Sequence, residues 1–172
     1  MAPKSPHPSR SLLHPPALPK GLTTRIGYLL NRPALLFRER AAQILKPLGL
    51  IPPHFGVIAT LESEGPKTQR ALGALLRVDP TTMVWLIDHL EKAGLVRRGQ
   101  HPKDRRAHLV ELSPSGKAVY RQASIRLNAL DAEFLSPLTK SEQDELRRLL
   151  MKLFQSVPVQ TIPKDFYQKG AK

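Results

Sequence analysis

Hydrophobic residues recur with the 3.6-residue spacing of amphipathic helices along most of this 172-residue chain. The pattern predicts helices over residues 22–46, 52–65, 68–76, 80–93, 114–134 and 139–156. After the fourth of these the spacing changes to two, in the stretches LVRRGQ and RAHLVELS, which are separated by HPKD. Alternation around a turn is typical of a β-hairpin. The predicted fold class is therefore mainly α with a small β-hairpin.

Residues that satisfy free backbone groups mark the expected helix boundaries. Thr68 and Asp79 are good N-caps, and Pro80 occupies a first helical position, where its missing N–H costs nothing. Gly94 has the place of a left-handed cap at the end of the helix over 80–93. The starts of the last two helices are marked by Ser113–Pro114 and by a Thr139/Glu142 capping box.

Pro33 interrupts the helical pattern over 22–46. A proline inside a helix costs about 3 kcal/mol unless it lies in the first turn. We therefore expect either a kink near residues 29–33 or two helices, the second of which starts at Arg32–Pro33.

The helix over 80–93 carries an apolar stripe and an outward face of unusual composition. Met83, Leu86, Ile87 and Leu90 form the stripe, which we expect to face the core. The residues left to face outward are Pro80, Thr81, Thr82, Val84, Trp85, Asp88 and His89. Trp85 is the chain's one tryptophan. In the preceding helix we expect the three leucines Leu72, Leu75 and Leu76 to face inward.

The charge balance indicates a polyanionic partner. Lys and Arg number 27 against 14 Asp and Glu, which gives a net charge of +13 and a pI near 10.5. Nucleic acid is the first candidate and an anionic membrane surface the second. Cysteine is absent, which excludes disulfides, thiolate metal sites and thiol nucleophiles. No apolar run approaches the roughly 20 residues of a membrane helix, so we expect a cytoplasmic protein without a membrane partner.

Residues 54–112 follow the order of a winged helix: two helices, a short turn, a third helix and a basic hairpin. A major groove about 12 Å wide admits one α-helix, whose N-terminal residues reach base edges. An arginine-bearing loop beside it can enter the narrow minor groove. The pattern therefore predicts a helix-turn-helix with a wing that binds double-stranded DNA.

The stretches DPTTM, LIDHLEKAGLV and HPKDRRAHLVELSPSG resemble the MarR (multiple antibiotic resistance regulator) family of winged-helix repressors. The family's wing pattern stands here as Asp104, Arg106, Leu112, Ser113 and Gly116. The resemblance implies a homodimeric transcriptional regulator without enzymatic activity and without a cofactor.

The resemblance assigns DNA contacts to two sets of residues. The recognition helix would contribute Pro80, Thr81, Thr82, Val84, Trp85 and His89. In the wing, Arg106 would read the minor groove and Asp104 would hold the wing by pairing with a basic residue. The expected backbone contacts are Thr68, Arg70, Arg97, Arg98, Lys103 and Arg105.

This chain departs from the family pattern at two places. Many relatives have glycine at the position of Arg77, so Arg77 must take a left-handed or bridge conformation, or the turn differs. Many relatives also have Thr–Arg where this chain has Val84–Trp85. Two interpretations of Trp85 stay open: it offers an apolar plane to a thymine methyl, or its indole lies across the wing base or the preceding helix.

In relatives a small aromatic or anionic molecule binds between the dimerisation and DNA-binding regions. The candidate lining residues here are Tyr28, Arg32, His54 and Phe55. The alternative interpretation is that these are ordinary core or surface residues. The six histidines show no metal-binding spacing, and neither a catalytic triad nor a phosphate loop can be recognised, so no metal or catalytic site is expected.

The domain organisation that we expect has four parts. Residues 1–20 form a basic, proline-rich arm, 21–50 and 113–156 a dimerisation region, 51–112 the winged helix-turn-helix lobe, and 157–172 a tail. Two rival functions remain: an architectural protein that coats DNA without reading its sequence, and a protein-binding winged helix anchored by Trp85.

Overall fold

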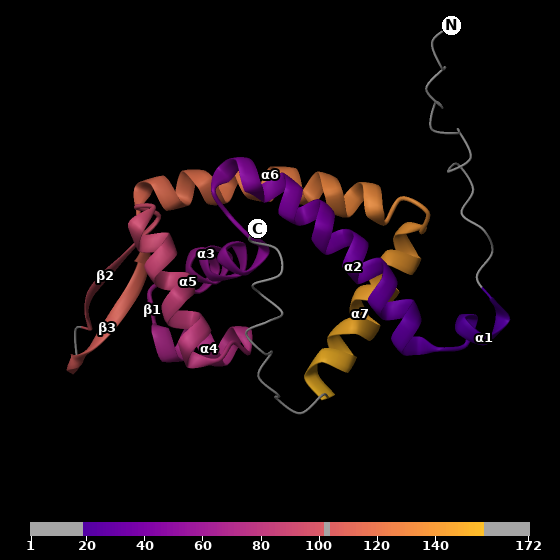
Figure 1. The fold of residues 1–172 in the computed structure, drawn as a ribbon, viewed down its shortest axis with the longest axis horizontal. Helices are drawn as coiled ribbons and strands as arrows, with labels where there is room; N and C mark the ends of the chain where they lie inside the picture. Colours follow the sequence, from indigo (N-terminus) through magenta and orange to yellow (C-terminus); the bar gives the residue numbers. More distant parts are fainter. Residues whose placement is uncertain (1–18, 102–103, 157–172) are drawn as a thin grey trace, which may run out of the picture. The chain divides into compact units, whose positions relative to one another are not determined.

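The computed structural model describes residues 19–101 and 104–156, with side chains described outside residues 101–107 (Figure 1). The expected N-terminal arm lies outside this range except for its last two residues, and so does the whole tail over 157–172. The elements in chain order are α1 (Lys20–Thr23), α2 (Ile26–Leu45), a 3-10 turn (Lys46–Leu48), α3 (Pro52–Glu64), β1 (Lys67–Thr68), α4 (Gln69–Leu76), α5 (Pro80–Lys92), β2 (Val96–His101), β3 (Asp104–Leu112), α6 (Pro114–Phe134) and α7 (Lys140–Ser156).

The chain divides into two compact units, residues 1–36 and 37–172. Helix α2 runs without a break through Pro33, and the short helix α1 precedes it. The prediction of a second helix starting at Arg32–Pro33 was therefore wrong. The break falls earlier, at Thr24–Arg25, where Thr24 closes α1 by donating its N–H to Leu22 O.

The sheet has three antiparallel strands in the order β1-β3-β2. The expected hairpin pairs Val96 with Leu112 and Gly99 with Leu109, and a register shift follows at Gln100/His101. Strand β1 was not predicted, because two residues are too short to show an alternating pattern. It pairs Lys67 with Val110 and so attaches the start of α4 to the wing.

One hydrophobic core joins α3, α4, α5 and α6 to the sheet. The predicted stripe of α5 is at its centre: Met83, Leu86, Ile87 and Leu90 are all buried. The inward prediction for α4 is right for Leu72, which is fully buried, and wrong for Leu75, which is 53% exposed. Leu76 is partly buried against the core. Leu75 lies on the far side of Leu72 from Leu76, about 100° around the helix from Leu76 and so at the edge of the buried side.

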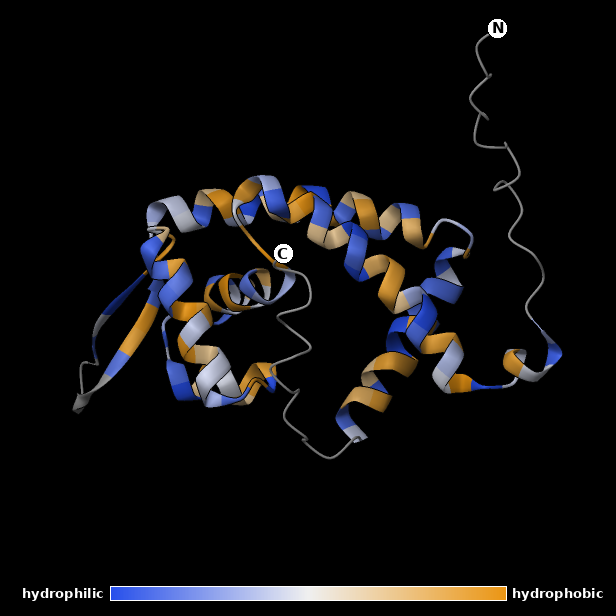
Figure 2. Cartoon of the chain, in the orientation of Figure 1, coloured by the Kyte–Doolittle hydropathy of each residue, from blue (hydrophilic) through white to orange (hydrophobic). Residues whose placement is uncertain are grey.

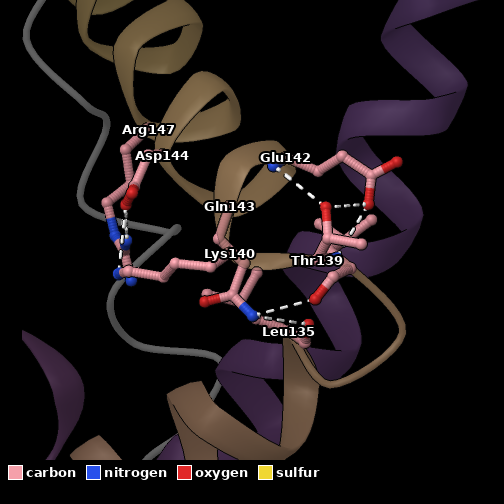
Figure 3. A network of polar contacts seen from close by, with 8 residues as sticks. Leu135, Thr139, Lys140, Glu142, Gln143, Asp144 and Arg147 are labelled. Atoms are coloured by element: carbon pink, nitrogen blue, oxygen red, sulfur yellow. Dashed lines mark hydrogen bonds and ion pairs between the residues drawn. The ribbon is translucent and has the colours of Figure 1, made fainter.

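The predicted caps are present as hydrogen bonds. Ala71 N–H donates to Thr68 Oγ1 at 3.2 Å and Thr82 N–H donates to Asp79 Oδ1 at 3.0 Å. Figure 3 shows the capping box of α7, in which Thr139 N–H donates to Glu142 Oε2 at 2.7 Å. These contacts fix where α4, α5 and α7 begin.

Helix α7 is hydrophobic along one side and charged along the other, which Figure 2 shows as orange segments between blue ones. Its side chains Leu149, Leu150, Met151, Leu153 and Phe154 are all exposed in the single chain. Among the described residues, no single helix is long and apolar enough to cross a membrane. Only the bent pair Ile26–Leu48 and Pro52–Glu64 is long and apolar enough, by length and composition alone.

Candidate nucleic-acid interface

The turn between α4 and α5 is closed by backbone hydrogen bonds around a left-handed residue. Arg77 has φ 53°, which is the left-handed conformation among the alternatives that the sequence left open, and its N–H donates to the carbonyls of Gly73 and Ala74. Val78 N–H donates to Gly73 O at 2.9 Å. A Cβ on Gly73 would lie 3.1 Å from Val78 O, so glycine there permits the close return of the chain.

The N-terminal turn of α5 presents small side chains on its outer face. Pro80 and Thr81 are exposed, and Val84 is 40% exposed. Thr82 was expected to face outward, and this was wrong: it is buried, and its hydroxyl hydrogen-bonds to the carboxylate of Asp79. Because Thr82 serves the N-cap, the outward turn of the helix consists of Pro80, Thr81 and Val84.

Trp85 lies in an aromatic cluster with two histidines. Its ring centroid is 5.7 Å from that of His54 on α3, with the planes 26° apart, and 4.9 Å from that of His89 on α5. The side chain remains 36% exposed. The indole therefore packs on α3, and neither the wing base nor α4 provides the stacking partner that one interpretation expected. The exposed part of the indole lies on the same helix as Val84.

His54 is the buried member of this cluster. Ile51 N–H donates to His54 Nδ1 at 3.4 Å, which assigns the proton of the neutral ring to Nε2. Nε2 has no hydrogen-bond partner among the described residues. Burial, followed by the nearby charge of His89, lowers the pKa of His54 from 6.5 to about 4. The ring is therefore neutral at physiological pH and contributes an apolar surface to Trp85.

Arg98 of the wing strand β2 is held by two carboxylates of α5. Its guanidinium lies 2.5 Å from Asp88 Oδ1 and also pairs with Glu91. The hydrogen bond that Arg98 donates to Asp88 is the largest of the causes that raise the pKa of Arg98. Arg97, the next residue along the chain, instead pairs with Glu111 on β3 at 2.9 Å and is more exposed. Arg98 thus connects the wing to the recognition helix.

The wing joins α6 through a close contact at Gly116. Ser113 N–H donates to Leu95 O at 3.0 Å, and the hydroxyl of Ser113 contacts Gly94 O at 2.6 Å. A Cβ on Gly116 would lie 2.0 Å from Leu95 O. Gly94 itself has φ 69°, as expected for the cap of α5. The glycine of the wing pattern is therefore required by the approach of α6 to the turn between α5 and β2.

The remaining predicted backbone contacts are only partly visible. Thr68 uses its hydroxyl as the N-cap of α4, and Arg70 is exposed without an ion-pair partner among the described residues. The side chains of Lys103, Asp104, Arg105 and Arg106 lie outside the described residues.

The comparisons with known proteins agree with this geometry. The MarR family model matches residues 50–108. An HTH-type transcriptional repressor of Mycobacterium tuberculosis is 32% identical over 128 residues, which cover 74% of this chain and 92% of the repressor. The chain belongs to the MarR family.

Solved structures of MarR-family proteins share the fold. A mutant MarR from E. coli complexed with operator DNA is 27% identical and superposes with a TM-score of 0.69 over 76% of this chain and 94% of the other. CouR from Rhodococcus jostii bound to p-coumaroyl-CoA is 26% identical, with a TM-score of 0.73 over 83% of this chain and 100% of the other. This chain is therefore a winged-helix transcriptional regulator of the MarR family.

The four candidate ligand-pocket residues fall into both units of this MarR-family chain. Tyr28 and Arg32 are on α2 within residues 1–36. On α3, His54 lies under Trp85, and the ring of Phe55 stacks on Tyr120 of α6 with centroids 5.9 Å apart. The structure thus joins one ligand candidate, His54, to two DNA candidates, Trp85 and His89. No sequence spacing indicated this contact, because α3 and α5 are separated by α4.

A cavity that the sequence did not indicate lies beside the helix-turn-helix turn. It has a volume of about 420 Å³ and is bounded by α4 and by the first residue of α5. Among residues 19–101 and 104–156, no group of three or more His, Asp or Glu could hold a metal ion.

Proposed function

We propose that this MarR-family chain is a homodimeric repressor that reads a symmetric site in double-stranded DNA and is released by a small aromatic or anionic ligand. The observation that carries the proposal is the fixed geometry of the reading surface. The exposed turn of α5 is capped by Asp79, and the wing strand is attached to the same helix through Arg98. A recognition helix and a basic wing held in one orientation suit adjacent grooves of DNA.

The DNA contacts proposed for the recognition helix are Pro80, Thr81, Val84 and Trp85, with His89 one turn further along. Their apolar and small side chains suit thymine methyl groups more than guanine edges, which bind arginine or lysine. We therefore expect operator half-sites rich in A·T pairs. Arg106 is proposed as the minor-groove reader of the wing, and Arg70, Arg97, Lys103 and Arg105 as phosphate contacts.

Dimerisation is proposed through the helices that flank the winged helix, in residues 21–50 and 113–156. Support comes from the exposed apolar side chains of α7, among them Leu153 at 49% exposure, and from Ile26, Leu29 and Leu30 of α2. Apolar side chains gathered on one element of a monomer indicate an interface. In a two-fold dimer the half-sites are about 10–10.5 base pairs apart.

Light scattering of the purified protein tests the dimer. We expect twice the chain mass for the natural protein, and the mass of a single chain for Leu153→Glu, because burial of an unpaired carboxylate opposes association. Leu75→Glu is the matched control, since Leu75 is similarly exposed but lies on α4, outside the proposed interface. A single-chain mass for the natural protein contradicts this part of the proposal.

The effector is proposed to bind near His54 and Phe55 of α3; Tyr28 and Arg32 of α2 stay candidates that the sequence alone suggests. CouR, of similar fold, is bound to p-coumaroyl-CoA, which shows that such a ligand can be held by a relative. A ligand that displaces His54 removes the surface on which Trp85 packs. By linkage, a releasing ligand must bind the DNA-free form more tightly than the DNA-bound form.

Selection of bound duplexes from a random pool at physiological salt tests sequence reading. The proposal predicts enrichment of an A·T-rich inverted repeat. Retention without a shared motif supports the architectural alternative, because salt-dependent binding is common to both functions. Failure to retain any duplex leaves the third alternative, a protein partner that binds the Trp85 surface.

A further inference from the structure

The last turn of α7 is capped by a side chain of the helix-turn-helix turn. The last four carbonyls of an α-helix have no partner within the helix. Arg77 Nη2 donates to one of them, Phe154 O, at 2.9 Å, and the Ser156 hydroxyl donates to its neighbour, Leu153 O, at 2.9 Å. A cation at this end of a helix also interacts favourably with the helix dipole. Arg77 therefore acts as a C-terminal cap for a helix that is distant in sequence.

The same guanidinium also contacts the side chain of Phe154. Its carbon lies 4.1 Å from the centroid of the Phe154 ring. A cation at this distance from an aromatic face is attracted by the ring electrons. Arg77 and α7 both belong to the unit over residues 37–172. One side chain thus makes two different contacts with one residue, and together they restrict where the end of α7 can lie relative to the turn.

Arg77 makes these contacts from a strained backbone conformation. With φ 53° and ψ 41° it is the one residue other than glycine that has a positive φ in the described part of the chain. Glycine takes this conformation without the steric cost of a Cβ. The backbone alone therefore gives no reason for an arginine at this position, whereas the two contacts with Phe154 do.

Helix α7 is held at its two ends. Every residue of α7 is described, and none of them is buried. At its start, the amide of Gln143 donates to Leu135 O at 3.2 Å and to Leu138 O at 3.0 Å (Figure 3). A helix of 17 residues is about 25 Å long, so a small rotation at its start displaces its end by several ångströms. The contact with Arg77 opposes that displacement.

We propose that Arg77 is a positioning residue: by capping α7 at Phe154, it fixes the direction of α7 relative to the recognition helix α5. The turn that contains Arg77 continues directly into α5, which starts at Pro80. This role goes beyond the proposed function and needs neither DNA nor a second copy of the chain. Its consequence for DNA rests on the proposed dimerisation through α7, in which the same contact sets the separation of the two recognition helices.

Energy transfer within one chain measures this direction, because Trp85 on α5 is the one tryptophan and cysteine is absent. Lys152→Cys, at an exposed position of α7, accepts a dansyl label. Labelled chains are mixed with an excess of unlabelled Trp85→Phe chains, so that donor and acceptor belong to the same chain. We expect a narrow distribution of donor–acceptor distances with Arg77 present, and a distribution about twofold broader in Arg77→Gly, because the released end of α7 moves. Arg70→Ala is the matched control, since it removes the same charge from α4 and leaves the contact with Phe154 intact.

A second variant tests the other side of the contact. Phe154→Ala should also broaden the distribution, though less, because the carbonyl of residue 154 still accepts from Arg77. The double variant should be no broader than Arg77→Gly alone, since both changes remove one interaction. Arg77→Gly should keep the urea midpoint of the natural protein, because relief of backbone strain offsets the lost contact. This readout separates a positioning role from general destabilisation.

Three results would overturn the positioning role. They are a distribution that stays narrow in Arg77→Gly, a distribution that is already broad with Arg77 present, and equal broadening in Arg70→Ala. Because DNA is absent and the transfer occurs within one chain, each of these results leaves the proposed dimer and its reading of DNA to their own tests.

Discussion

Replacement of Arg98 by methionine tests whether this residue positions the wing or contacts phosphate. The substitution keeps most of the side-chain length and removes the guanidinium that pairs with Asp88 and Glu91. The Arg98 side chain is 29% exposed and its two partners more so, so solvent screens both pairs. Partly exposed pairs contribute about 0.2–1 kcal/mol each, so for two pairs we expect the free energy of unfolding to fall by about 0.4–2 kcal/mol in total.

The DNA affinity of Arg98→Met separates the two roles through its salt dependence. Loss of a phosphate contact makes the plot of log binding constant against log salt concentration shallower, by about one unit of slope. A positioning residue leaves that slope unchanged while affinity falls, because the same phosphates are contacted by a wing that is no longer held. We expect the second result for Arg98, measured by titration of a labelled duplex at several salt concentrations.

Arg97→Met is the matched control on the adjacent residue. Arg97 pairs with Glu111 and is 69% exposed, so its removal should change the free energy of unfolding by less than about 0.5 kcal/mol. A lower salt slope for Arg98→Met together with unchanged stability would refute the positioning role. Arg98 would then be the phosphate contact that the sequence suggested.

Three further predictions concern stability and reading. The pKa of His54 is about 4 in the folded chain and 6.5 in the unfolded chain, so between these values only the unfolded chain binds the proton. The free energy of unfolding, measured with urea, should therefore be at its full value above pH 6.5 and fall by up to about 3 kcal/mol towards pH 4. His54→Leu should lack this loss. Gly116→Ala should destabilise by about 1–3 kcal/mol, whereas Gly99→Ala, with 3.6 Å of clearance, should not; equal melting temperatures would contradict the contact. Trp85→Ala should lower stability and also weaken selection for thymine, and an unchanged binding motif would mean that the indole only packs.

Sequence periodicity was sufficient to predict the recognition helix α5. The helix over 80–93 was predicted correctly in extent and in its buried stripe, because four large apolar residues at helical spacing admit one inward face. Its caps were predictable for the same reason, since Asp79, Pro80 and Gly94 act on neighbouring backbone groups.

Contacts between distant segments could not be predicted in this way. Asp88 was expected only to face outward; its pairing with Arg98, like that of Glu91, arises because the fold places β2 beside α5. The stacking of His54 under Trp85 likewise depends on how α3 and α5 pack. Thr82 was misplaced because its hydroxyl can satisfy Asp79, a local alternative that a hydrophobicity pattern does not distinguish from exposure.

A hydroxyl-radical footprint on a duplex obtained by selection tests the central claim most directly. Two copies, each with α5 in a major groove and its wing in the flanking minor groove, predict a two-fold symmetric pattern. The two halves should be about 10–10.5 base pairs apart, with protection of the outer minor grooves. A single asymmetric footprint, or uniform protection along the duplex, would contradict a dimer that reads DNA through the exposed turn of α5.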